Sequence, residues 1–250
     1  MNKTFKMLTI VSLLLLLTIG IMEPAVAGPG GKIASALFQT LWGKVLLFFL
    51  VILFLPLILY TLVREYLAQR RTLNDLRQLA LVNDLFDWLS LRDRITDCFY
   101  HVHAAWHNEN RVEASEWVTN WYWKNQQLVY LEAWAKEGLV NHCQVKKISS
   151  IRPLFLAYRG DDKQAEGSRI VVSIAAYMED YLAKRETGLL VEGKKGFQEV
   201  ETVWTFKVQE GQWVVANIEE DMLSLEYAQL ANELPAYVEG YKEVYKGRLF

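Results

Sequence analysis

The sequence predicts an α+β domain, a sheet with helices on one face, that follows two apolar segments at the N-terminus. Two observations carry this fold class. Apolar side chains recur at helical spacing over much of residues 64–137, and they alternate with polar ones in the period of strands over much of residues 142–219. Helices followed by a run of antiparallel strands are typical of such a domain.

The composition of the 250-residue chain excludes several classes of protein. The chain is 52% hydrophobic and 13% aromatic, whereas a disordered chain would be poorer in both kinds of residue. Its net charge of −2 argues against a nucleic-acid partner recruited by bulk positive charge. Two cysteines, Cys98 and Cys143, are too few for a disulfide framework or a four-thiolate metal site.

The first 27 residues have the pattern of a secretory signal peptide. A short basic region precedes the apolar run Met7 to Met22, and the small residues Ala25-Val26-Ala27 follow. This order predicts cleavage after Ala27. The alternative is an uncleaved first membrane helix. Residues 28–40 would then be a short extracytoplasmic spacer in the cleaved form.

Residues 41–63 are predicted to cross a membrane as one helix. The stretch from Val45 to Val63 contains 19 uncharged residues, about the length that a bilayer core requires. Pro56 falls inside it. The excess of basic side chains after the span predicts an N-terminus outside and a C-terminal domain in the cytoplasm; these are Arg64, Arg70, Arg71 and Arg77.

Three helical segments are expected after the span. Residues 64–88 form a stalk or linker, helical to about Val82. Ser90 and Asp93 indicate a capping box for a helix that ends near Asn108. The third helix would run from Glu113 to Glu137, and at 100° per residue it carries two aromatic stripes. Either it is buried on both sides, or one stripe, Trp123, Tyr130 and Trp134, is a contact surface.

The strand period begins after Asn141. Strands are expected over 142–148, 154–158, 170–176 and 198–208, and Glu210-Gly211 would turn the chain into a final strand over 212–219. Residues 221–250 are expected to form a helical tail, interrupted near Pro235.

The stretch from about Leu89 to Glu220 resembles the Tim forty-four-like domain family. Its matching residues are Thr187-Gly188, Val191-Glu192-Gly193, Glu201, Trp204-Thr205-Phe206, Trp213, Ala216 and Ile218. This family includes the C-terminal domain of the mitochondrial import-motor tether and bacterial membrane-anchored relatives. The resemblance implies a curved, cone-like antiparallel sheet backed by helices, similar to the nuclear-transport-factor-two superfamily, in a single-pass protein of the bacterial inner membrane.

The resemblance also implies a groove that holds a protein partner or lies against lipid. The chain lacks the long charged N-terminal segment by which the mitochondrial tether engages its chaperone, and its N-terminus is unlike a mitochondrial transit peptide. The chaperone-recruiting role is therefore not implied. A role in membrane protein biogenesis or transport is compatible with what remains.

Catalytic and metal motifs are weak in this sequence. It contains no Gly-rich phosphate loop and no nucleophile elbow, and His103 and His107 lack a third ligand nearby in the sequence. No cofactor and no metal are expected. Some cone-like domains of the related superfamily are enzymes with an Asp or His general base, for which the candidates are His103, Asp180 and Tyr177.

The favoured hypothesis is a non-catalytic interaction domain that tethers a protein partner at the membrane, without nucleic acid. Its contact surface would be the open face of the sheet around Trp204, Phe206 and Trp213, or the stripe of Trp123, Tyr130 and Trp134. The alternative is a small-molecule or lipid-binding cone, with or without enzymatic activity.

Overall fold

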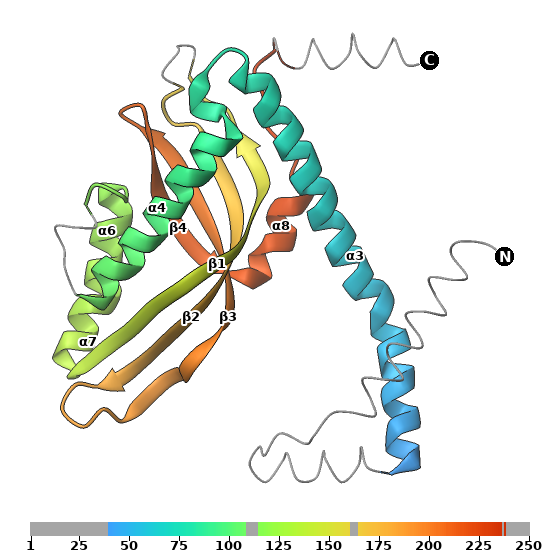
Figure 1. The fold of residues 1–250 in the computed structure, drawn as a ribbon, viewed down its shortest axis with the longest axis vertical. Helices are drawn as coiled ribbons and strands as arrows, with labels where there is room; N and C mark the ends of the chain where they lie inside the picture. The colour runs from blue at the N-terminus through green and yellow to red at the C-terminus, as the bar shows by residue number, and fades with distance from the viewer. Residues whose placement is uncertain (1–39, 109–114, 161–164, 237, 239–250) are drawn as a thin grey trace. The chain divides into compact units, whose positions relative to one another are not determined.

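The computed structural model describes residues 40–108, 115–160, 165–236 and 238 (Figure 1). The predicted signal peptide and nearly all of the spacer lie outside the described residues, as do residues 239–250 of the predicted tail. The chain divides into two compact units, Met1–Tyr60 and Thr61–Phe250.

Helix α3 (Leu41–Ala80) contains the predicted span and most of the predicted stalk. Of the helices that the structure describes, it is the one long and apolar enough to cross a membrane, and its most apolar window is not buried. Pro56 lies inside the helix without ending it. From Thr61 onward α3 belongs to the second unit, where Leu76 and Leu79 enter the main apolar core.

Four strands form one antiparallel sheet in the order β1-β2-β3-β4 (Figure 1). They are β1 (Leu139–Ala157), β2 (Arg169–Lys184), β3 (Leu190–Gln209) and β4 (Gln212–Glu220). The α+β class is therefore confirmed. Two strands were expected over this stretch, but β1 is continuous. It lies at the edge of the sheet, so Pro153, which has no N–H group, can be accommodated without the loss of a hydrogen bond to a neighbouring strand.

Helix α4 (Trp88–His107) covers the inner face of the sheet (Figure 1). Its buried residues Leu91, Ile95, Phe99 and Val102 meet alternate residues of β2, β3 and β4, as the apolar spacing predicted. The helix begins earlier than expected. Asp87, not Ser90, is the N-cap, because its carboxylate accepts hydrogen bonds from the Ser90 amide and hydroxyl. A short 3₁₀ turn, η1 (Asp84–Phe86), precedes it.

The predicted helix over 113–137 is wrong in its N-terminal part. Val118 forms a parallel bridge with Val215 of β4, and the flanking backbone atoms of Trp117 and Thr119 bond to Val215. Helix α6 (Asn120–Gln126) starts after this bridge and passes into the π-helical η2 (Gln127–Leu131) and then α7 (Glu132–Lys136). Two stripes at 100° per residue therefore do not exist, since both the start and the period change.

The outer face of the sheet is crossed by helix α8 (Ser224–Gln229), which follows the 3₁₀ turn η3 (Asp221–Leu223). Tyr227 of α8 packs on a small apolar cluster of Phe155, Ala157, Val171 and Val203. Beyond α8, Glu233 exchanges backbone hydrogen bonds with β1 at Leu156 and Tyr158. The expected helical tail is thus interrupted after Gln229, where the chain runs alongside the end of β1.

Candidate functional site

Three zones follow one another along the part of the outer face nearest the start of β2. Arg152, Ser173 and Glu201 form the first zone, and the apolar cluster under Tyr227 forms the second. Arg169, Thr205 and Lys207 form the third, where β2 begins and β3 ends. Because side chains alternate between faces along a strand, all of these point away from the core under α4. The outer face therefore carries the polar groups of this sheet that are available for binding.

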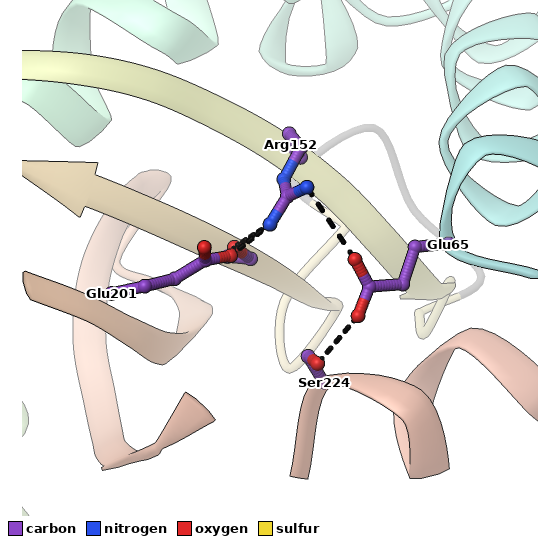
Figure 2. Close-up of polar contacts among 5 residues, drawn as sticks. Glu65, Arg152, Glu201 and Ser224 are labelled. Carbon is purple, nitrogen blue, oxygen red and sulfur yellow. Dashed lines mark hydrogen bonds and ion pairs between the residues drawn. The ribbon is translucent and has the colours of Figure 1, made fainter. Parts of the chain in front are cut away.

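The first zone is a charge cluster, defined by Glu65, Arg152, Glu201 and Ser224 (Figure 2). The Arg152 guanidinium pairs with Glu201, and its Nη1 atom lies 3.4 Å from Glu65 Oε2. Ser224 donates a hydrogen bond of 2.7 Å to the other Glu65 oxygen. The cluster thereby joins α3, β1, β3 and α8.

Negative charge is in excess around Arg152. Burial raises the pKa of the nearby Asp221 carboxyl, and the carboxylates of Glu201 and Glu65 raise it further. Ser173 donates a hydrogen bond to Glu201 and accepts one of 3.2 Å from Arg152. Each side chain of the charge cluster is bonded to another of its members, although the Nε atom of Arg152 is buried without a hydrogen-bond partner among the described residues. We therefore assign the cluster to holding the elements together.

The third zone is an open depression of about 500 Å³. Five elements (α6, β2, β3, β4 and α8) and the turn before α6 line it: Thr119, Asn120, Trp121, Arg169, Thr205, Lys207, Gln209, Ala216, Asn217 and Tyr227. We call it the outer depression. Its volume lies in the range of ligand-binding sites, and six of its ten lining residues carry a side-chain amide or hydroxyl group.

Among the residues that the structure describes, two cations and no carboxylate line the outer depression. Arg169 of β2 and Lys207 of β3 are direct register partners on neighbouring strands. Neither makes an ion pair with the parts of the chain that the structure describes. Like charges placed directly opposite each other destabilise a sheet. The fold thus retains an unfavourable pair at this position.

Aromatic side chains stand at two sides of the outer depression. Trp121 is 69% exposed. Tyr227 donates a hydrogen bond of 2.7 Å to Glu219, and burial, with this bond as the second cause, raises the pKa of Tyr227 to about 12. Its phenol is therefore neutral over the physiological range. An exposed tryptophan beside cations and amides is typical of contact surfaces between proteins.

The predicted face of Trp204, Phe206 and Trp213 is part of the core, which corrects the expectation of an open surface there. These residues are buried under α4, with Trp204 4.9 Å from the Phe99 ring and the Trp213 indole bonded to the Leu85 carbonyl. The physical reason is simple: their alternation marks the apolar face of β3 and β4, and a helix covers that face. The open face carries Thr205 and Lys207 instead.

The predicted stripe of Trp123, Tyr130 and Trp134 is divided. Trp123 is half-buried and packs against the main core. Trp134 is half-buried beside Trp106, and Tyr130 is exposed, with its ring 5.6 Å from that of Trp134. Trp134 and Trp106 line a small pocket of about 80 Å³. The three residues do not form one continuous exposed surface.

The three candidates for general acid–base chemistry do not come together. His103 donates a hydrogen bond of 2.7 Å from Nδ1 to the Phe99 carbonyl, and its ring lies 5.5 Å from that of Trp204 on the inner face. Burial lowers the pKa of His103 to about 4. Tyr177 contacts Phe197 and Lys146 on the outer face, and Asp180 is paired with Cys143 in the register. None of the three lines the outer depression.

Within the described residues, no group of three His, Cys, Asp or Glu side chains could hold a metal ion. His103 and His107 turn to different neighbours: His103 lies over Phe99, and His107 lies 6.3 Å from His142. Both cysteines are buried, and burial raises the pKa of the Cys98 thiol to about 12.

The residues that sequence reasoning missed are Trp121, Arg169, Lys207 and Tyr227. Thr205 and Lys207 occupy the polar positions of a strand whose apolar positions were recognised, so the alternation itself marked them. The pairing of Lys207 with Arg169 depends on the register across the β2–β3 hairpin, which no local pattern gives. No protein-family model and no curated protein sequence matches this chain.

Proposed function

We propose that this chain is a membrane-anchored, non-catalytic domain that holds a protein partner at the bacterial inner membrane, and that the partner contacts the outer depression. The proposal includes membership of the Tim forty-four-like family, with the N-terminus outside and the domain in the cytoplasm. A role in membrane protein biogenesis or transport fits such a tether. The conclusion depends most on one observation, the pairing of Arg169 with Lys207 beside the exposed Trp121, where neither cation has an ion-pair partner among the described residues.

Two features of α3 support the anchor. Its segment from Val45 to Val63 is uncharged, and the most apolar window of the helix is left unburied. Apolar side chains such as Phe49, Leu53 and Leu57 are more than half exposed, which a soluble domain would avoid. The arginines that follow the span support the orientation with the domain in the cytoplasm.

The filled inner face favours a surface contact over a ligand-binding cone. Phe99, Trp204 and Phe206 occupy the space between α4 and the sheet, and all three are buried. A partner therefore has the outer face to bind, and there the depression between α8, β4 and the turn before α6 offers polar groups and an aromatic wall. The filled inner face therefore gives no support to a second function in which the sheet forms a cone that binds a small molecule or a lipid.

Site-specific photo-crosslinking in intact cells tests the contact surface. A photoreactive residue is placed at Trp121 or Gln209 in the outer depression, and at Tyr100 on the exposed side of α4 as the control. We expect the first two positions to crosslink the same protein, identified by mass spectrometry, and Tyr100 not to. Equal products from all three positions, or products from Tyr100 alone, would refute the outer depression as the contact surface.

The orientation has its own test. Glu186 is exposed in the β2–β3 connection, and both native cysteines are buried, so Glu186→Cys introduces one accessible thiol. We expect a membrane-impermeant maleimide to label this variant only after the cells are permeabilised. Labelling in intact cells would place the domain outside and overturn the cytoplasmic part of the proposal.

A further inference from the structure

We infer that the outer depression binds an acidic segment of the partner, a short stretch of polypeptide with neighbouring Asp or Glu side chains. This inference rests on the proposed function and specifies the chemistry of the partner. It starts from the charge of the site. The chain as a whole has a net charge of −2, yet the ten described residues that line the outer depression are two cations and eight uncharged side chains.

The two cations are positioned as a pair. Arg169 and Lys207 lie directly opposite each other on adjacent strands, where neighbouring side chains are about 5 Å apart. Their mutual repulsion is relieved when an anion lies between or above them. A bound carboxylate therefore gains from both cations and removes a repulsion that the unbound domain carries.

The neutral part of the lining suits a polypeptide backbone. Asn120, Gln209 and Asn217 carry side-chain amides, which both donate and accept hydrogen bonds. Thr119 and Thr205 add hydroxyl groups, of which the Thr119 oxygen already accepts a hydrogen bond of 3.3 Å from the Tyr122 amide. An extended chain presents alternating N–H and C=O groups that these side chains match, and Trp121 offers an apolar wall to its side chains.

A membrane surface fits this site less well. Domains that lie against lipid place large aliphatic or aromatic side chains around their basic residues. The described part of the lining of the outer depression contains no Leu, Ile, Val, Phe or Met. The site also lies on strands and lacks a glycine-rich loop, which is the usual cradle for a phosphate group. An acidic peptide thus explains the lining better than a headgroup.

Peptide binding to the full-length chain in detergent tests this inference. The probe is a fluorescently labelled peptide of alternating Glu and Gly, and its counterpart has Gln in place of Glu. We expect the Glu peptide alone to bind, and to bind less tightly as salt is raised. Arg169→Gln and Lys207→Gln should each weaken binding by about fivefold, the effect of one partly exposed ion pair.

Lys147→Gln is the matched control, because Lys147 is an exposed lysine on β1 outside the outer depression. It should bind the Glu peptide as the parent does. Loss of binding in the Arg169 and Lys207 variants will not reflect unfolding, since removing one of two like charges should leave the melting temperature unchanged or raised. Lys207→Glu, which reverses the charge, should abolish binding of the Glu peptide.

Several outcomes would overturn the inference. One is equal binding by all variants, and another is no binding of the Glu peptide. A third is binding of phosphatidylglycerol vesicles or inorganic phosphate that depends on Arg169 and Lys207 while the Glu peptide fails. If crosslinks at Trp121 and Gln209 persist when the peptide fails, the contact surface stands and its partner is not acidic. If the crosslinks fail as well, the proposed function falls with the inference.

Discussion

Glu65 of α3 and Arg152 of β1 form an ion pair in which the Glu65 side chain is 13% and the Arg152 side chain 28% exposed. This pair connects the part of α3 that follows the apolar segment to the edge strand of the sheet. Because Arg152 also pairs with Glu201, one guanidinium serves two carboxylates from two elements. Partly buried ion pairs of this kind stabilise the fold only while both the cation and the anions are present.

Arg152→Leu should therefore destabilise the domain. The substitution leaves Glu65 and Glu201 close together without a cation, and we expect the free energy of unfolding to fall by about 2 kcal/mol, a value reduced for partial exposure. Urea unfolding followed by tryptophan fluorescence measures the change. Arg159→Leu is the control, since its pair with Glu233 is about half exposed and should contribute under about 0.5 kcal/mol. Equal effects of the two substitutions would contradict this interpretation.

His103 should make stability depend on pH. Burial lowers the pKa of His103 to about 4 from an ordinary value of 6.5, so between these values the unfolded chain binds more protons than the folded one. Stability must then fall as the pH drops through this window, by about 2 kcal/mol between pH 7 and pH 5. His103→Gln should remove this component. If the variant and the parent lose the same stability between the two pH values, His103 titrates normally.

Trp123 and Trp134 should behave as packing residues. Both are half-buried, one against the main core and the other against Trp106. Trp123→Ala combined with Trp134→Ala should lower the free energy of unfolding by about 3 kcal/mol. Trp121→Ala, at a residue that is 69% exposed, should change it by under about 0.5 kcal/mol. A stable double variant that loses the crosslinked partner would instead restore the stripe as a contact surface.

Two glycines of β3 should respond differently to the same substitution. A Cβ atom at Gly193 would lie 2.7 Å from the Asp180 carbonyl oxygen, and φ there is +80°. At Gly196 φ is +99°, but a Cβ atom would meet nothing within 4 Å. We expect Gly196→Ala to lower the free energy of unfolding by about 1 kcal/mol and Gly193→Ala by at least about 2 kcal/mol. Equal losses would mean that the close approach to β2 relaxes at little cost.

The fold could be predicted where one residue pattern decides the structure. Alternation in β2 and β3 and the spacing of Ile95, Phe99 and Val102 in α4 depend on burial of a single face. The helix prediction was wrong before α6 because a contact with a distant strand decides the structure there. Trp117 and Val118 fit a helical pattern locally. The bridge between Val118 and Val215 forms instead, because it satisfies the hydrogen bonds of backbone N–H and C=O groups beside β4.

The outer depression could not be predicted, because its residues are brought together by register and not by sequence. Arg169 and Lys207 become partners only when β2 and β3 pair with a particular offset, and two irregularities shift that register. Tyr227 arrives from α8 across the outer face. Alternation correctly placed Trp204 and Phe206 on the same face of β3. The prediction that this face is open was wrong, because the apolar face of a strand is the one that a helix covers.

Strand β3 is longer than β4, so part of β3 has no neighbouring strand on one side. β4 pairs with β3 only from Thr202 to Gln209, so the half of β3 that begins at Leu190 forms a sheet edge beyond β4. Open edges can recruit strands from other molecules and so begin aggregation. Here two glycines in left-handed conformations bend the edge, and Lys194 and Lys195 lie between them. These features of the hairpin hinder other copies of this chain from adding strands to the open edge.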